Sequence, residues 1–247
     1  MRNLTRAFFS FPEVVDPARH RDYNGWHQLD HRPQNLALDG VAHGDRWVRT
    51  PDCRRASAVD VDPDLGAAHY VAMYWFREPA RASIEQWREL GTTTLEQGRR
   101  PELAWTRRRH TGFYRPIEGL VAPGVPVSAD AVPYRPHRGV VLEVLRADDP
   151  MDPRTGGGFA RHRADVAAAL ERPGVAGAWS FGSRDASGAT PDGSTRLTLL
   201  WCDDDPIRVA AGLPDPLTEP GLRTVLRTPL LSIQPHQWDW FDAAPVQ

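Results

Sequence analysis

The feature that most constrains the fold is the order of strand-like and helix-like segments, which runs β-α-β-β-α-β twice along the 247 residues. In the first half, apolar runs and helical spacing predict four strands and two helices. These segments are strand 4–15, helix 17–38, strand 41–50, strand 68–77, helix 79–97 and strand 102–117. Asp16 and Pro17 are typical of a helix start. Pro33 is expected to end or kink this helix, and the polar segment 51–66 predicts a surface loop.

The second half repeats this plan. Its predicted segments are strand 138–146, a Gly-rich link 155–158, helix 159–171, strands 176–182 and 195–203, a short helix within 206–219, and strand 222–234. The turn around Gly40 resembles the turn around Gly174, and both glycines suit the left-handed position that ends a helix. Trp75 and Trp201 fall at matching places in their strands.

This order is that of the ferredoxin-like split β-α-β unit. We therefore expect an α+β protein in which two such units form one pseudo-dimeric barrel. The first unit covers residues 1–120, a Pro-rich linker covers 121–137, and a degenerate second unit covers 138–247.

Composition excludes several classes of protein. The net charge of −2 gives no basic footprint for nucleic acid, and no apolar run is long enough to span a membrane. Cys53 and Cys202 form no CxxC pair, which argues against a disulfide scaffold or a cysteine zinc site. The N-terminus has no long apolar region typical of a signal peptide, so we expect a cytoplasmic protein. The chain has no lysine, which most simply reflects a GC-rich coding bias.

The segment 20–49 carries an unusual density of His, Asp, Tyr, Trp and Arg, where a core-facing helix would carry Leu, Ile and Val. His27 and His31 are four residues apart and share a helix face. We expect His27 to act as the acid or base, with Asp30 as its carboxylate partner. His31 and Tyr23 are further catalytic candidates that can polarise an oxygen.

Each of these residues has another interpretation. His27 and His31 have the spacing of metal ligands, but no third ligand is evident, so we predict no metal. His31 can instead interact with the helix C-terminus, and Tyr23 can be a packing residue.

Strand 41–49 should place Val41, His43, Asp45, Trp47 and Arg49 on one face. This mixed face can line a pocket inside the barrel, so we take His43, Trp47 and Arg49 as substrate-binding candidates. Tyr74 and Trp26 complete that set. A β-bulge near Gly44 would instead shift the alternation and leave His43 at an edge.

Three further segments have weaker signals. Residues 105–115 hold four arginines and fit either an anion clamp or a solvated edge strand. The TGGG of 155–158 suggests a phosphate loop, but it lacks the GxGxxG and GKS patterns. The terminal WDWF of 238–241 predicts a hydrophobic plug across the barrel or against a partner subunit.

The sequence Trp26-His-Gln-Leu-Asp-His-Arg-Pro33, followed by Asn35, Gly40-Val41 and Arg46-Trp47, resembles the EthD-like branch of the dimeric α+β barrel proteins. The second half lacks the His-x-x-Asp-His sequence, so a site is expected in the first half only. The resemblance implies a cofactor-independent lyase, isomerase or cyclase that acts on a small aromatic or polyketide-like carbonyl compound.

Other functions remain open at this stage. One is a haem-dependent enzyme of the same superfamily, with His27, His43, His110 or His162 as the axial ligand. Others are a non-enzymatic small-ligand-binding protein and a metal-dependent oxygenase. The expected partner is a small-molecule substrate, and the chain can be a monomeric pseudo-dimer or a homodimer.

Overall fold

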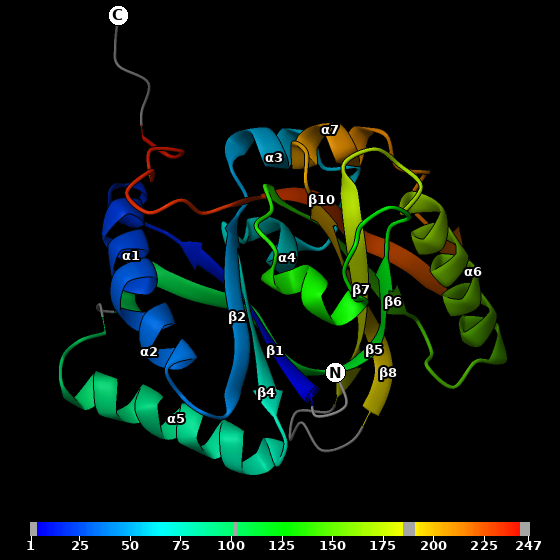
Figure 1. The fold of residues 1–247 in the computed structure, drawn as a ribbon. Helices are drawn as coiled ribbons and strands as arrows, with labels where there is room; N and C mark the ends of the chain where they lie inside the picture. Colours follow the sequence, from blue (N-terminus) through cyan, green and yellow to red (C-terminus); the bar gives the residue numbers. More distant parts are fainter. Residues whose placement is uncertain (1–3, 101–102, 185–190, 243–247) are drawn as a thin grey trace, which may run out of the picture.

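The computed structural model describes residues 4–100, 103–184 and 191–242 and contains the two predicted series of strands and helices (Figure 1). The first series comprises β1 (Leu4–Val14), α1 (His20–Trp26), η2 (His27–His31), α2 (Arg32–Leu36), β2 (Val41–Val48), β4 (Tyr70–Arg77), α5 (Ala80–Glu96) and β5 (Thr106–Val121). The second comprises β6 (Gly139–Ala147), α6 (Pro153–Ala169), β7 (Val175–Arg184), β8 (Pro191–Cys202), α7 (Pro206–Ala211) and β10 (Leu222–Ser232). Short elements connect them: η1 (Pro17–Arg19), α3 (Pro51–Arg55), β3 (Val59–Asp60), α4 (Pro63–Ala67), η3 (Leu103–Trp105), η4 (Ala129–Tyr134) and β9 (Thr218–Glu219).

The strands form one closed antiparallel barrel. Their order is β2-β4-β1-β5 in the first half and β7-β8-β6-β10 in the second, which is the same ferredoxin-like order. β5 pairs with β7, and β10 pairs with β2, so the two halves meet at two seams. The predicted α+β class and pseudo-dimeric barrel are confirmed. The division into units 1–120 and 138–247 with a linker at 121–137 stays a prediction.

The barrel interior is a packed apolar core. Trp75 and Trp201 lie in it at corresponding register positions, opposite Ala7 and Val140, and both are fully buried. Around them lie inward-facing side chains from every strand of the two series, among them Phe9, Phe11, Met73, Phe181 and Leu199. Since side chains fill this space, the interior is a core and not a pocket.

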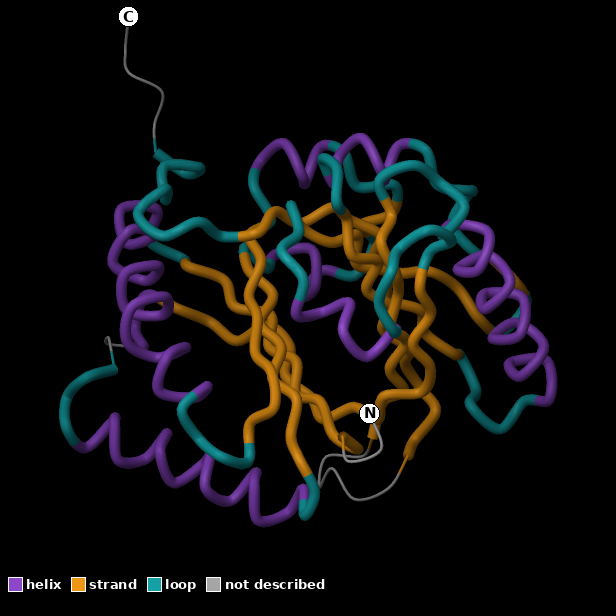
Figure 2. The backbone as a smooth tube through the Cα atoms, viewed as in Figure 1, coloured by secondary structure: helices purple, strands orange, loops and turns teal. Residues whose placement is uncertain are grey.

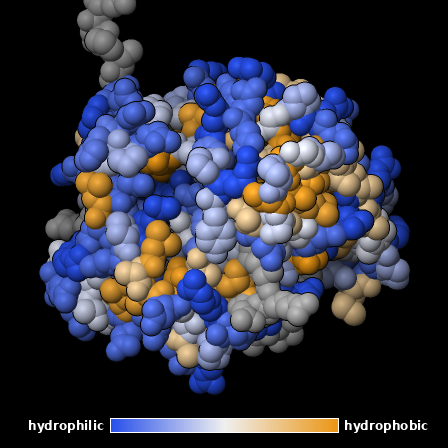
Figure 3. All heavy atoms as spheres, in the orientation of Figure 1, coloured by the Kyte–Doolittle hydropathy of each residue, from blue (hydrophilic) through white to orange (hydrophobic). Residues whose placement is uncertain are grey.

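The helices lie outside the barrel (Figure 2). α1, α2 and α5 cover the outer face of the first half, and α6 covers that of the second (Figure 1). On the face seen in Figure 3, apolar residues gather beside α2 and β2, above α5. No helix in the described part of the chain is long and apolar enough to cross a membrane.

Several local predictions were wrong. Segment 51–66 contains α3, β3 and α4 and is not a plain loop. The TGGG of 155–158 lies inside α6, which starts at Pro153 after the N-cap Asp152, so the segment is no phosphate loop.

The two glycines predicted to end helices differ. Gly174 adopts the predicted left-handed φ of 85°. Gly40 does not, and is instead required by close packing, because a Cβ there would lie 2.6 Å from the Ser83 side chain.

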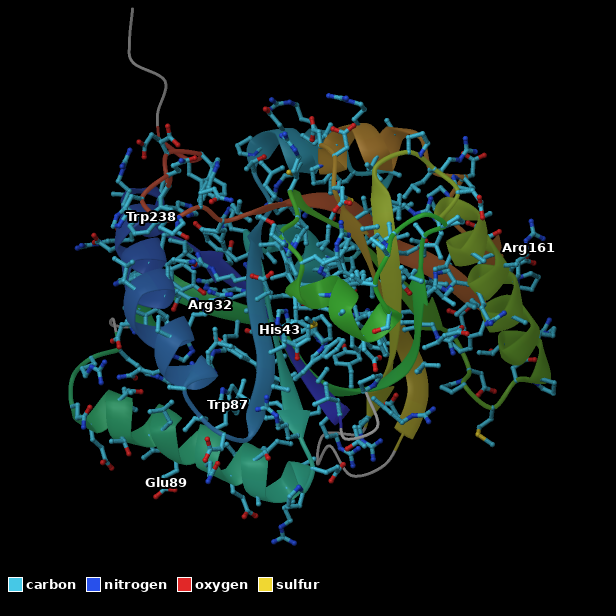
Figure 4. All side chains as sticks on the ribbon, viewed as in Figure 1. Arg32, His43, Trp87, Glu89, Arg161 and Trp238 are labelled. Atoms are coloured by element: carbon cyan, nitrogen blue, oxygen red, sulfur yellow. The ribbon has the colours of Figure 1, made fainter. Side chains whose placement is uncertain are left out.

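The WDWF segment packs on the outside of the first half and does not plug the barrel. Trp238 belongs to a cluster with Val14, Tyr23 and Tyr70, and it lies beside α1 in Figure 4. Phe241 stacks on His20 with ring centroids 3.9 Å apart. The segment therefore fixes α1 to the sheet.

Candidate functional site

The helix that carries the candidate histidines is continuous but changes its winding. Asp16 caps the first turn by accepting a hydrogen bond from the Ala18 N–H. The chain then forms a π-helical turn at His27–His31, in which the Arg32 N–H reaches the carbonyl of His27. Pro33 follows in α2 and does not end the helix, since the helical path continues to Leu36. Such π turns occur often at functional sites.

A cavity of about 350 Å³ lies between this helical segment, α5 and the outer face of β1, β4 and β5. Aromatic side chains form much of its wall, and arginines form part of its edge. Trp87 reaches from α5 toward α2 and the sheet, whereas Glu89 on the same helix points away (Figure 4). The residues that line the cavity include Phe8, Ser10, Pro12, Tyr23, Trp26, His27, His31, Asn35, Ala72, Tyr74, Trp87, Arg88, Leu95, Arg100, Thr106, Arg107 and Arg108.

The two histidines belong to a group of stacked rings. His31 stacks on Trp26, with centroids 4.6 Å apart and planes inclined by 21°. His27 meets His31 edge-on at 5.0 Å, and the Tyr23 ring lies 5.9 Å from His27. The helical spacing thus places both imidazoles at one wall of the cavity, as the sequence predicted.

Four of the lining side chains carry a buried polar atom that has no hydrogen-bond partner among the described residues. These atoms are His27 Nδ1, Tyr74 Oη, Trp87 Nε1 and Arg100 Nε. Buried polar groups are almost always paired in folded proteins, because an unpaired group costs about 1–3 kcal/mol. Their concentration around one cavity is the pattern expected of a site that a polar ligand completes.

Burial and positive charge set the protonation of this site. Burial lowers the pKa of His27 well below its usual value, and Arg46 and His31 lower it further. Burial, followed by the charges of Arg100 and Arg108, lowers the pKa of His31 to about 3. Both imidazoles are therefore neutral near pH 7. Burial raises the pKa of Tyr74, so this phenol stays a hydrogen-bond donor.

Arg46 lies behind the cavity wall and is 1% exposed. Its guanidinium carbon lies 5.1 Å from the Tyr23 ring centroid and 4.6 Å from that of Tyr70. It donates to Asn24 Oδ1, but its Nε and Nη1 have no partner among the described residues. A positive charge thus sits beside the aromatic wall of the site.

The structure brings together five of the nine predicted site residues. Tyr23, Trp26, His27, His31 and Tyr74 all line the cavity. The other four, Asp30, His43, Trp47 and Arg49, do not.

The predicted pairing of Asp30 with His27 is wrong, because the Asp30 carboxylate pairs with Arg99 at the protein surface. A helix places residues i and i+3 on one face, but Arg99, in the segment after α5, forms an ion pair with the Asp30 carboxylate instead.

From His43 onward, the predicted pocket face of β2 points into the barrel or to its rim, because the register shifts between Val41 and His43. Trp47 is fully buried in the core and donates to His137 Nε2 at 3.1 Å. Arg49 pairs with Asp60 at 2.6 Å and donates to Thr228 Oγ1 at 3.0 Å. His43 packs against Tyr134, with centroids 4.7 Å apart, and does not reach the cavity. It is the opposite face of β2, with Arg46, that points toward the helices.

Sequence reasoning missed Trp87, Arg100 and the role of Arg46. Trp87 fits the apolar spacing of the helix and gave no separate signal. Arg107 and Arg108 belong to the arginine-rich strand noted above, and they line the cavity from the start of β5.

The four candidate haem ligands lie in different surroundings. His110 Nε2 lies 2.7 Å from Tyr114 Oη, and His43 Nε2 is buried without a partner among the described residues. His162 alone has a ring nitrogen on a buried carboxylate, 3.1 Å from Glu143 Oε2, an arrangement typical of metal-ligating histidines. The cavity is lined by His27 and not by His162. Its residues therefore do not supply a histidine held by a carboxylate, which is the axial ligand that haem would need. No cluster of three His, Cys, Asp or Glu side chains suited to a metal ion occurs among the described residues.

Comparisons with known proteins show the fold. No protein-family model and no curated protein sequence matches the chain. Among solved structures, a candidate chlorite dismutase is similar over 97% of this chain and 98% of its own, with a TM-score of 0.52 and 11% identity. An anthrone oxidase-like protein is similar over 93% and 92%, with a TM-score of 0.51 and 9% identity. The chain therefore shares the dimeric α+β barrel fold, and assignment to the EthD-like branch stays a prediction.

Proposed function

We propose that the cavity of the first half is the active site of a cofactor-independent lyase, isomerase or cyclase. The substrate would be a small aromatic or polyketide-like carbonyl compound. The observation that carries the proposal is the group of unpartnered buried polar atoms, His27 Nδ1 and Tyr74 Oη among them, around one aromatic-lined cavity. Sites for small ligands commonly combine an apolar wall with a few polar groups.

In this proposal His27 takes a proton from the carbon next to the substrate carbonyl. The carbonyl oxygen becomes an enolate oxygen, and His27 returns the proton to another carbon for isomerisation or to a leaving group for elimination. Neutral imidazole is the required starting form, and the low pKa of His27 supplies it at neutral pH. Positioned proton transfer of this kind contributes about 10²–10⁴-fold to a rate.

The charge around the site favours the enolate. The same arginine charges that lower the pKa values of His27 and His31 attract a negative oxygen. Tyr74 and the neutral His31 can each donate a hydrogen bond to it, as a neutral histidine does in other proton-transfer enzymes. As the enolate forms, its negative charge raises the pKa of the nearby His27 and makes proton transfer to that ring more favourable.

Two further observations support the substrate class. The rings of Phe8, Tyr23, Trp26, Tyr74 and Trp87 line the cavity, and they suit a flat aromatic compound. A protein of the same fold is named for its likeness to an oxidase of anthrone, which is an aromatic ketone.

The test is exchange of the methylene protons of phenylpyruvate, a small aromatic ketone, with D₂O, followed by proton NMR. We expect the wild type to accelerate exchange and His27→Gln to reduce that acceleration about 100-fold. His20→Gln is the matched control, because His20 is also buried on the same helix but contacts Tyr70 and does not line the cavity. Equal rates for His27→Gln and the wild type, with both proteins folded, would contradict the proposal and favour a ligand-binding protein.

A second candidate function is a haem-dependent enzyme, favoured by the contact of His162 with Glu143. In that case His162 would hold the iron through its other ring nitrogen, and the haem would supply redox chemistry. Titration of the protein with haemin, followed by the Soret band, tests this candidate. A His162-dependent shift of that band would support it, and a spectrum unchanged by His162→Ala would exclude it.

A further inference from the structure

Positive charge surrounds the cavity on several sides. Arg88, Arg100, Arg107 and Arg108 line it, from α5, the segment after it and the start of β5. None of the described lining residues is Asp or Glu. A cavity of this size with four arginines and no described carboxylate is strongly biased toward anions.

These arginines differ from their neighbours in how they are paired. Arg99 pairs with Asp30, and Arg109 donates to Glu13 at 2.8 Å. The four cavity arginines form no ion pair with any carboxylate in the part of the chain that the structure describes. Arg88 instead lies over the Phe113 ring at 5.5 Å.

Two of the positive groups are also short of hydrogen-bond partners. Arg100 Nε is buried and unpartnered among the described residues. Arg46, 1% exposed behind the wall, has two guanidinium nitrogens without a partner among the described residues. It lies over the rings of Tyr23 and Tyr70 and donates to the Asn24 amide oxygen. A buried cation without a counter-ion is costly, and an anion placed nearby offsets that cost.

We propose that the substrate is an aromatic carboxylate, with its carboxylate held by Arg100 and Arg108 and its ring against Trp26 and Trp87. This inference rests on the proposed function and names the substrate class of the same site. Guanidinium groups bind carboxylates through paired, charge-assisted hydrogen bonds. Arg46 adds attraction from behind the wall without touching the ligand.

The experiment compares 1-naphthoate with 1-naphthamide, which has nearly the same shape but no charge, by isothermal titration calorimetry. We expect the carboxylate to bind the wild type at least about tenfold more tightly, as a charge-assisted hydrogen bond predicts. Arg100→Gln and Arg108→Gln should each weaken naphthoate binding about tenfold and leave naphthamide binding within about twofold. Added salt should weaken only the binding of naphthoate.

Arg109→Gln is the matched control, because it removes the same charge from the strand that carries Arg108, at a residue that does not line the cavity. It should leave both affinities within about twofold of the wild type. Naphthoate binding no tighter than naphthamide binding, including no binding of either, would overturn the inference, as would an equal loss in Arg109→Gln.

The binding result is separable from the proposed chemistry. His27→Gln should keep the preference for naphthoate while it loses proton exchange. If the preference persists but His27→Gln exchanges phenylpyruvate protons at the wild-type rate, the carboxylate site stands and the catalytic role of His27 fails. If exchange depends on His27 but the preference is absent, the proposed function stands and the carboxylate inference fails.

Discussion

Glu143 lies on the outer face of the second half, beneath α6, at the register position that corresponds to Ser10 in the cavity of the first half. Its carboxylate accepts hydrogen bonds from Thr224 Oγ1 at 2.9 Å and from Arg227 Nε and Nη2 at 3.1 and 2.7 Å, and it lies 3.1 Å from His162 Nε2. All four side chains are buried. Breaking such a group by removing one charge costs about 3–5 kcal/mol, because the partner charge stays buried and unpaired.

Glu143→Gln is therefore expected to lower the stability of the protein by about 3–5 kcal/mol and the melting temperature by about 6–20 °C. The matched control is Glu118→Gln, which removes an exposed pair with Arg163. It should cost about 0–1 kcal/mol. Thermal unfolding followed by tryptophan fluorescence measures both changes. Similar losses for the two variants would refute the argument that burial makes the Glu143 group costly to break.

The effect of Glu143→Gln should also depend on pH. Burial raises the pKa of Glu143, but the hydrogen bond with His162 and the charge of Arg227 outweigh this effect, so the pKa lies below its usual value. The stabilisation is therefore complete above the unfolded-state value and is lost as the pH falls through the lower folded-state value. The difference between the wild type and the variant should be constant from pH 6 to 8 and shrink below about pH 4. A difference that grows on acidification would contradict this.

Two other predictions concern packing and proton transfer. Gly40→Ala should cost about 1–3 kcal/mol, because its Cβ would lie 2.6 Å from the Ser83 side chain, whereas Gly156→Ala faces open space within α6 and should gain about 0.5–1 kcal/mol. Urea unfolding measures both, and a destabilised Gly156→Ala would show that α6 needs glycine there. Because the pKa values of His27 and His31 are lowered, the latter to about 3, kcat/KM for proton exchange should be flat from pH 6 to 8. A break near pH 6.5 in a pH–rate profile would show that the reacting histidine has an ordinary pKa.

Alternation and helical spacing were sufficient to predict the barrel, because each strand has one face in the core and each long helix one face on the sheet. The short helices in 51–66 were missed, although each begins with a capping residue followed by proline, the same pattern that predicted a helix start at Asp16 and Pro17. Thr50 and Asp62 each precede a proline and cap the following helix. A five-residue helix has too few turns to show a period, so the cap was its only sequence signal.

The site residues that lie close together on one helix were predicted from their spacing. The residues whose position depends on tertiary packing were not. His27 and His31 share a face in any helical winding close to α. The direction of the two faces of β2 depends on which one the helices cover, and alternation alone leaves that choice open. Trp47 and Arg49 were therefore assigned to the site, and Arg46, on the opposite face, was missed.

The two seams of the barrel, β5 with β7 and β2 with β10, join strands of a single chain. A barrel closed between two separate chains loses stability on dilution, because association depends on their concentration. Here the second half is always present at the high effective concentration that a covalent link gives. Closure of this barrel should therefore be independent of protein concentration. The two outer faces are also free to differ, one with an open cavity and the other with a buried charged group that holds the sheet to its helix.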